Sequence, residues 1–148
     1  MSAPPDDAPL AVVVVNYQSY DELRDCLTSL RSAGGHHQVV VVDHASDATA
    51  ADALTSAFPE VRFLRVAANE GFAAGVNRGA RAAAGSPFIL LLNPDCVVRP
   101  ATGDALLAWM RGHPDVGAAG PRIHNADGTL QPTARKFPDL TTGFAGRS

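Results

Sequence analysis

Short apolar runs alternate with amphipathic stretches along most of the chain. The apolar runs are rich in β-branched residues or leucine and predict strands at residues 11–15, 39–42, 61–66 and 88–92. Helical spacing of apolar or small residues predicts helices at residues 21–31, 49–58, 71–84 and 103–112. This alternation predicts βαβ units, and therefore an α/β fold with a mostly parallel sheet and helices on both faces.

The two ends of the chain break this pattern. Residues 1–9 contain two acids and three prolines and predict a disordered leader. Residues 10–122 are expected to form one α/β domain, in which residues 116–121 supply a fifth strand. Residues 123–148 are expected to begin with a hairpin, because Asp127-Gly128 is a turn signal, and to continue as an irregular tail.

Composition narrows the class of partner. The chain has 148 residues, a net charge of −3, a pI near 5.9 and no basic run, which argues against nucleic acid as a partner. Cys26 and Cys96 have neither metal-ligand spacing nor disulfide density, which fits a reducing cytoplasm. No signal peptide and no transmembrane span are predicted, because no apolar run approaches about 20 residues. Attachment at a membrane surface stays open.

Polar residues recur where the predicted strands end. Because the carboxyl ends of parallel strands lie at one edge of a sheet, and ligands bind at that edge in open α/β sheets, these residues predict one binding cleft. Pro94 fixes its own φ and holds Asn93 in extended backbone at the end of the fourth strand, so Asn93 and Asp95 can be presented rigidly. The candidates at this edge are Asn16, Tyr17, Asp43, Ser46, Asn69, Gly71, Asn93 and Asp95.

Individual candidates suggest different contacts. A carboxylate such as Asp43 can accept hydrogen bonds from a base N–H or from ribose hydroxyls, whereas Asp47 is expected to cap the following helix. Gly71 lets the backbone approach a ligand, and the helix that begins there favours a phosphate. The amide of Asn77 is placed to reach a ribose or a diphosphate. Gly75 and Gly79 are expected only to permit tight packing.

Asp95 suits a hard divalent cation. Mg²⁺ commonly takes one or two protein carboxylates together with substrate phosphates, and such an ion neutralises a departing diphosphate. The histidines show no metal-ligand spacing, and surface positions are expected for His44 and His124. Cys96 is expected to pack rather than to react. These residues together predict a nucleotide-diphosphate site with metal-assisted departure of the diphosphate.

Four segments, taken in order, resemble the inverting glycosyltransferases of family two, and especially their rhamnosyltransferase-like branch. They are VVVVNYQS, VVVVDHASD, NEGFAAGVNRGARAA and FILLLNPDCVV, within a resemblance that covers about residues 10–138. The resemblance implies a Rossmann-like GT-A fold, a dTDP- or UDP-sugar donor, Mg²⁺ or Mn²⁺, and a glycan or lipid-linked acceptor. It also implies polysaccharide or cell-wall synthesis in the cytoplasm, with peripheral attachment at the inner face of the cell membrane as an option.

The resemblance also implies roles for single residues. Asp43 would meet the nucleotide base with Tyr17 beside it, and Asn77 would contact the ribose or diphosphate. Asn93-Pro94-Asp95 stands where the family has Asp-x-Asp, so Asp95 would remain as the metal ligand. Asn93 is neutral and would bind ribose or sugar hydroxyls instead.

The catalytic base is not assigned. In the family it is an acid beyond the donor half, but the acids after Arg122 are only Asp127 and Asp139, and neither lies in a base-like motif. The chain is therefore expected to be a donor-binding half followed by the start of an incomplete acceptor region. A nucleotide-sugar-binding module without turnover is the alternative. A nucleotidyltransferase is disfavoured, because residues 16–20 contain neither glycine nor a basic residue.

Overall fold

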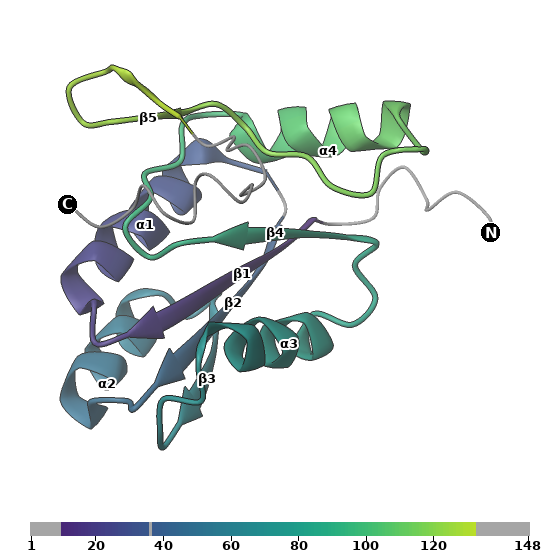
Figure 1. Ribbon diagram of the computed structural model, residues 1–148. Coiled ribbons are helices and arrows are strands. Elements are labelled where there is room, and N and C mark those ends of the chain that lie inside the picture. The colour runs from purple at the N-terminus through teal and green to yellow at the C-terminus, as the bar shows by residue number, and fades with distance from the viewer. Residues whose placement is uncertain (1–9, 36, 133–148) are drawn as a thin grey trace, which may run out of the picture. The chain divides into compact units, whose positions relative to one another are not determined.

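The computed structural model describes residues 10–35 and 37–132, in two compact units that divide after Pro114. The expected leader and most of the expected tail lie outside these residues. Elements of the first unit, drawn in Figure 1, are β1 (Leu10–Tyr17), α1 (Tyr20–Ala33), β2 (His37–His44), α2 (Ala48–Ala57), β3 (Arg62–Val66), α3 (Phe72–Ala82), β4 (Phe88–Leu92) and α4 (Thr102–Gly112). All eight coincide with predicted elements to within a few residues at each end.

The four strands form one parallel sheet in the order β3-β2-β1-β4. In the register, Val12 lies between Val39 and Leu90, and Asn16 lies beside Asp43 at the carboxyl end. Parallel pairing of all four strands places their carboxyl ends at the same edge of the sheet. The predicted mostly parallel α/β architecture is therefore confirmed.

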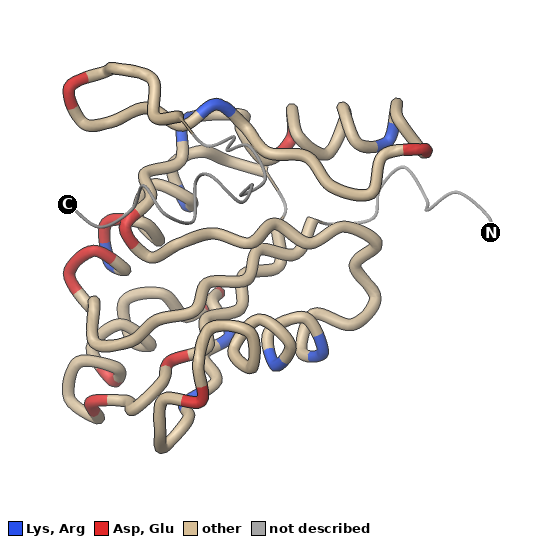
Figure 2. The backbone as a smooth tube through the Cα atoms, viewed as in Figure 1, with Lys and Arg blue, Asp and Glu red and all other residues tan. Residues whose placement is uncertain are grey.

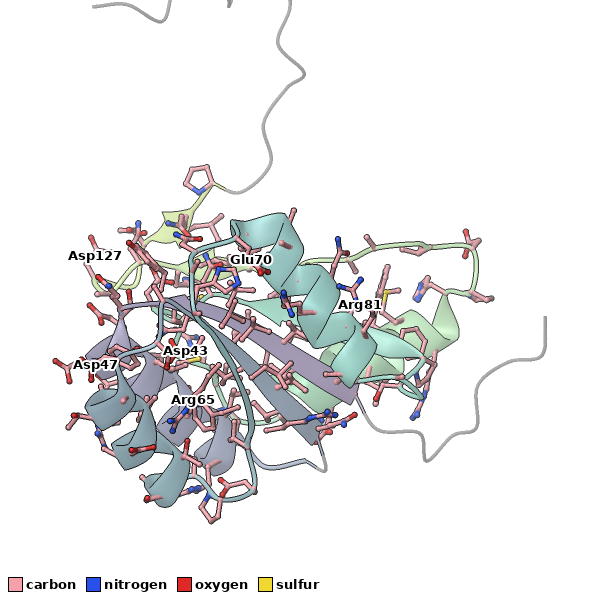
Figure 3. All side chains as sticks on the ribbon, turned by 90° about the horizontal axis from the view of Figure 1, so that it is seen from below. Asp43, Asp47, Arg65, Glu70, Arg81 and Asp127 are labelled. Carbon is pink, nitrogen blue, oxygen red and sulfur yellow. The ribbon has the colours of Figure 1, made fainter. Side chains whose placement is uncertain are left out.

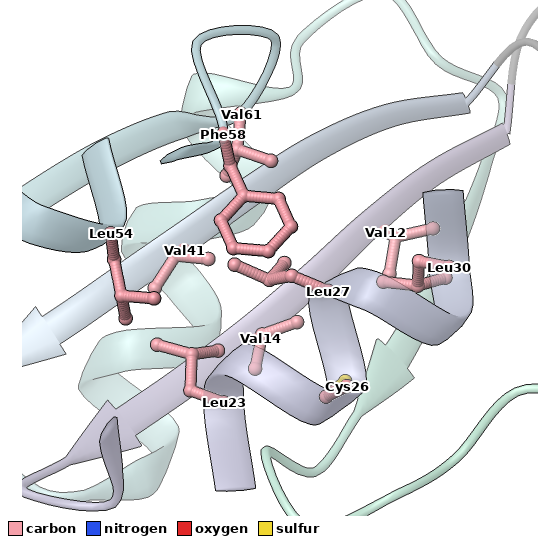
Figure 4. Close-up of a cluster of buried hydrophobic side chains, with 10 residues drawn as sticks. All are labelled: Val12, Val14, Leu23, Cys26, Leu27, Leu30, Val41, Leu54, Phe58 and Val61. Carbon is pink, nitrogen blue, oxygen red and sulfur yellow. The ribbon is translucent and has the colours of Figure 1, made fainter. Parts of the chain in front are cut away.

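Helices α1 and α2 cover one face of the sheet. Leu23, Leu27 and Leu30 of α1 recur at helical spacing and are buried with Cys26 against the valines of β1 and β2 (Figure 4). Leu54 of α2 joins the same cluster, in which each fully buried leucine contributes about 1.5–3 kcal/mol. This core fixes the strand ends that carry the candidate site.

Helix α3 covers the other face of the sheet and packs closely against β1. A Cβ at Gly75 would lie 2.7 Å from a methyl group of Val15, and a Cβ at Gly79 would collide with Val13. The packing predicted for these two glycines is therefore confirmed. Gly71 precedes the helix with φ at +87°, a backbone conformation that only glycine adopts without strain.

Strand β4 is covered on one face only, although its continuous apolar run is typical of a buried strand. Leu90 and Leu92 pack against the α1 side, but Ile89 and Leu91 on the other face are 41% and 49% exposed. The reason is that α3 contacts β1 and β2, and no described strand pairs with the outer edge of β4. Apolar composition alone does not distinguish an edge strand from a central one.

The second unit contains a small antiparallel hairpin, in which β5 (Ile123–His124) pairs with β6 (Leu130–Gln131). Gly128 supplies the turn with φ at +84°, as the Asp127-Gly128 signal predicts. The predicted fifth strand at residues 116–121 is wrong, because these residues pair with no strand in the described chain and are mostly exposed. Within residues 10–35 and 37–132, no helix is long and apolar enough to cross a membrane.

Candidate functional site

The candidate site begins with two buried polar residues at the ends of neighbouring strands. Asn16 ends the buried part of β1, Asp43 lies beside it on β2, and both are at most 1% exposed. Asn16 Nδ2 donates a hydrogen bond of 2.7 Å to Asp43 Oδ1. The structure therefore brings together two of the residues that the sequence singled out, 27 positions apart in the chain.

The carboxylate of Asp43 accepts three hydrogen bonds. Besides Asn16, Ser46 Oγ donates to Oδ2 at 2.6 Å, and the hydroxyl of Tyr20 donates to the same oxygen at 3.1 Å. These neutral donors replace the hydrogen bonds to water that the carboxylate loses on burial. In Figure 3, Asp43 lies next to Asp47 at the end of the sheet.

Tyr20 was missed by the sequence analysis. Its ring packs on the core at the start of α1, while its hydroxyl accepts a hydrogen bond of 2.7 Å from the backbone N–H of Asp47. Burial, followed by the negative charge of Asp43, raises the pKa of Tyr20, so the hydroxyl keeps its proton and remains a donor. No sequence spacing indicates these contacts, because Tyr20 lies 23 residues from Asp43 and 27 residues from Asp47.

Two acceptor positions remain open in this network. A carboxylate has about four lone-pair sites, and the described bonds occupy both sites on Asp43 Oδ2 but only one on Oδ1. Asn16 Oδ1 is buried without a hydrogen-bond partner. Buried acceptors without donors are costly, so this corner of the molecule favours a ligand that brings an N–H or O–H group.

A second cluster joins the end of β2 to the start of α3. Asn69 Oδ1 accepts from the backbone N–H of Gly71 at 2.9 Å and lies 3.2 Å from His44 Nδ1. Because that oxygen can only accept, Nδ1 of His44 carries the proton. His44 is 1% exposed with its ring against Gly75, so its predicted surface position is wrong. No pattern in the sequence distinguishes this buried histidine from an exposed one.

An ion pair ties the same loop to the next turns of α3. Arg78 binds Glu70 through two bonds of 2.7 Å, and these bonds lower the pKa of the Glu70 carboxyl. The pair is substantially exposed, so it contributes little stability by itself. The ion pair instead orients the loop that carries Asn69 and leads into the N-terminus of α3.

Asn93 and Asp95 lie on the turn that follows β4. The carbonyl of Asn93 accepts from the backbone N–H of Cys96 at 3.2 Å, and the thiol of buried Cys26 lies 3.7 Å from it. Burial raises the pKa of Cys26 to about 12. Both Asn93 and Asp95 are exposed, so their side chains are available to a ligand.

Tyr17 and Asn77 are the remaining candidates. Tyr17 ends β1 and is 50% exposed, which leaves its ring free to stack on a ligand. Asn77 stands between Gly75 and Gly79, which face the sheet, so its side chain is on the opposite side of α3. The structure does not bring Asn77 together with Asp43. Asp47 caps α2 by accepting from the Ala50 N–H at 2.8 Å, as predicted.

Asp95 is the residue of this edge that could ligate a divalent cation. Within the described residues, no group of three or more His, Cys, Asp or Glu side chains is arranged to hold a metal ion. Asp95 is one exposed carboxylate, which suits an ion that takes its other ligands from a diphosphate and water, as Mg²⁺ commonly does. Figure 2 shows acidic positions around the first turn of α1 and the start of α2. A cation would offset their repulsion of a diphosphate.

One hollow of the first unit lies away from Asp43. It has a volume of about 430 Å³ and runs along β3 and α3, where it is lined by Arg62, Arg65, Arg78 and Arg81. Arg65 pairs with Asp52 at 2.6 Å and Arg78 pairs with Glu70, so half of its positive charge is already neutralised. In Figure 3, Arg81 lies far along α3 from Asp43. Size alone therefore does not identify the site.

Comparisons with known proteins agree with this geometry. The model of the family described as Glycosyl transferase family 2 matches residues 11–146. An N-acetylglucosaminyl-diphospho-decaprenol L-rhamnosyltransferase of Mycobacterium tuberculosis, from strains CDC 1551 / Oshkosh and H37Rv, is 35% identical over 145 residues. The alignment covers 90% of this chain and 47% of the relative, so the chain spans about half the length of the curated relatives it matches.

Solved structures of S. aureus TarS share the fold. The structure of TarS 1–349 in complex with UDP-GlcNAc has a TM-score of 0.63 and 21% sequence identity, over 71% of this chain and 32% of that one. The complex of the same protein with UDP has a TM-score of 0.62. These matches confirm the predicted GT-A-type architecture.

Proposed function

The chain belongs to glycosyl transferase family 2, and we propose that its strand-end edge binds the nucleoside-diphosphate part of an activated sugar. The observation that carries the proposal is the buried pair of Asn16 and Asp43 at the ends of β1 and β2, with acceptor positions left open. The neighbouring strand ends supply an exposed ring at Tyr17 and an exposed carboxylate at Asp95. The base, the diphosphate and the cation would thus each meet binding groups along the carboxyl edge of the sheet.

The open acceptors favour a base with a ring N–H on its pairing edge. Uracil and thymine carry N3–H, which matches the free lone pair of Asp43 Oδ1, whereas the corresponding nitrogen of cytosine or adenine is itself an acceptor. Guanine also has a ring N–H, so this argument does not separate it from uracil. The family resemblance favours a dTDP- or UDP-sugar, and Ser46, Asn69 and Gly71 are the other proposed donor contacts. Asn77 is not retained as one, because its side chain lies on the side of α3 away from the sheet.

Asp95 is proposed to hold Mg²⁺ or Mn²⁺ at the turn after β4. When bound there, the cation would neutralise the diphosphate that departs from the sugar. Asn93 would supply a neutral amide to ribose or sugar hydroxyls beside it. The exposure of both side chains and the acidic surroundings of the strand ends support these assignments.

We infer that the complete activity is transfer of a hexose, of the rhamnose type, to a glycan or lipid-linked acceptor with inversion at the sugar carbon. Support comes from the family and from a relative whose name specifies an L-rhamnosyltransferase and a diphospho-decaprenol acceptor. A lipid-linked acceptor would place the protein at the inner face of the cell membrane, peripherally attached and otherwise cytoplasmic. Polysaccharide or cell-wall synthesis is the corresponding process.

The second candidate function is that of a nucleotide-sugar-binding module without turnover. The hydrogen bonds of Asp127 favour it. Inverting transfer needs a base that removes the proton of the acceptor hydroxyl. Asp127 Oδ1 already accepts from the Thr129 hydroxyl at 2.6 Å and the Thr129 N–H at 2.9 Å, and these bonds lower its carboxyl pKa. A carboxylate that is stabilised in this way is a weak base.

Calorimetry tests the nucleotide site directly. UDP, dTDP, GDP, CDP and ADP are titrated into the purified chain with Mg²⁺ or Mn²⁺ and again with EDTA. We expect UDP or dTDP to bind, CDP and ADP to bind at least tenfold more weakly for want of a ring N–H, and EDTA to weaken binding. No heat and no thermal shift with any nucleotide at millimolar concentration would refute the proposal.

A further inference from the structure

Tyr20 occupies a position that the proposed nucleotide contacts do not explain. It is the first residue of α1, yet its hydroxyl lies at the ends of β2 and the β2–α2 loop. It donates to Asp43 Oδ2 at 3.1 Å and accepts from the Asp47 N–H at 2.7 Å. One hydroxyl group therefore links three elements: α1, the end of β2 and the loop that starts α2.

We propose that Tyr20 is a positioning residue that sets the base specificity of the site by fixing which lone pair of Asp43 remains open. This inference rests on the nucleotide site proposed above. With Tyr20 and Ser46 both bound to Oδ2, that oxygen has no capacity left, and only Oδ1 can receive a donor from a ligand. The carboxylate is also prevented from rotating to present Oδ2.

The second hydrogen bond of Tyr20 extends the effect to the loop. Asp47 caps α2 through its side chain, and its backbone N–H points to the Tyr20 hydroxyl. Ser46, the other donor to Oδ2, is the residue before it. Loss of the Tyr20 hydroxyl would free the Asp47 amide, loosen Ser46 and give the carboxylate a choice of orientation.

The test is Tyr20→Phe, which keeps the ring packed on the core and removes only the hydroxyl. We expect UDP or dTDP to bind about tenfold more weakly. This factor corresponds to the loss of one hydrogen bond to a charged group, here the bond from the base N–H to Asp43 Oδ1. CDP should be affected little, so the preference for UDP over CDP should shrink by about the same factor. Hydrogen exchange of the Asp47 amide, followed by NMR without nucleotide, should become faster.

Two further variants separate positioning from stability. Thr28→Val removes a hydroxyl from the same helix, where it bonds only to the Arg24 carbonyl, and should change neither affinity nor preference. Ser46→Ala removes the other donor to Oδ2 and should reduce the preference for UDP over CDP in the same direction as Tyr20→Phe.

The possible outcomes distinguish this inference from the proposed function. A wild-type chain that binds no nucleotide overturns both. If wild type binds nucleotide and Tyr20→Phe has the same affinity and the same preference for UDP over CDP, only the positioning role is overturned. An equal loss for UDP and CDP with a lowered melting temperature would show that Tyr20 only stabilises the fold, which also overturns it.

Discussion

Asp43 shows how one residue can serve both the fold and a ligand. Its carboxylate is nearly inaccessible, and burying a charge is costly unless hydrogen bonds replace the lost water. Asn16, Tyr20 and Ser46 provide those bonds from β1, α1 and the β2–α2 loop. The same bonds hold the elements that surround the proposed base site, so the charge that would bind a ligand also organises its surroundings.

Asp95 gives the sharpest prediction for the proposed cation. Asp95→Asn keeps the shape of the side chain and removes its charge, so nucleotide affinity in the presence of Mg²⁺ or Mn²⁺ should fall by about 1–3 kcal/mol. With EDTA, wild type and variant should bind alike, since no cation is left to lose. Calorimetry measures both conditions.

The matched control for Asp95 is Asp25→Asn, which removes a negative charge from the exposed side of α1. It should leave the affinity with metal unchanged. Equal affinities of wild type and Asp95→Asn in the presence of metal would rule out Asp95 as the ligand. Melting temperatures of the two variants should match that of wild type, because both positions are exposed.

The two cysteines are expected to react at very different rates. Burial raises the pKa of Cys26 to about 12, so at pH 8 roughly one Cys26 in ten thousand is a thiolate, the reactive form. Its reactivity should increase with pH throughout the accessible range, because the thiolate population grows until the pH passes the pKa. A thiol titration of native protein should show one fast group, Cys96, and a second only in guanidinium.

Cys26→Ala identifies the slow thiol in that titration, since it should remove the slow group and leave the fast one. Two fast thiols in native protein would mean that Cys26 is exposed by frequent opening of α1 from the sheet. That result would contradict the buried core described for this face.

At the scale of elements, α3 depends on small residues for its close approach to the sheet. Gly79→Ala places a methyl group against Val13, a fully buried β-branched side chain that has little freedom to move. We expect the free energy of unfolding to fall by about 1–3 kcal/mol, the usual cost of overpacking. Urea denaturation measures it.

Gly112→Ala is the control for Gly79→Ala. It also lies in a helix, but its added Cβ would meet nothing within 4 Å, so it should be neutral or stabilising by up to about 1 kcal/mol. A Gly79→Ala variant as stable as wild type would mean that α3 can move away from the sheet at no cost.

The sequence predicted the elements well where a local pattern decides them. Continuous apolar runs located the first strands and helical spacing located the helices, because runs of buried valines and the spacing of leucines reflect packing directly. It failed at residues 116–121, where an apolar segment has no partner strand in the described chain, and at β4, whose outer face is uncovered. Pairing and cover are properties of the whole sheet, which local pattern does not contain.

The candidate site was predicted in part for the same reason. Parallel topology was sufficient to place Asn16 and Asp43 side by side, since strand ends share one edge. The hydrogen bonds of Tyr20 and the burial of His44 depend on side-chain contacts between distant residues, and no spacing reveals them. Asn77, chosen from its sequence neighbours, turned out to lie on the far side of α3 from the sheet.

At the scale of the whole molecule, the residues proposed to bind a ligand all lie in one of the two compact units. The first unit carries every residue proposed to bind nucleotide or metal. The second unit contains a hairpin whose strands, β5 and β6, have two residues each. The curated relatives are about twice as long as this chain. Binding and turnover are therefore separate questions, and each needs its own measurement.

We expect the 148-residue chain by itself to bind a nucleotide sugar but to transfer the sugar poorly. Cation-assisted departure of the diphosphate needs only Asp95 and the donor, so slow hydrolysis by water should persist with Mg²⁺ and stop with EDTA. Transfer also needs a base near the acceptor hydroxyl, and Asp127 is held by Thr129. Product formation is measured with dTDP- and UDP-sugars over a panel of glycan and lipid-linked acceptors. Robust multiple-turnover transfer would contradict this expectation, and Asp127→Asn, Asp139→Asn and His124→Ala would then locate the base.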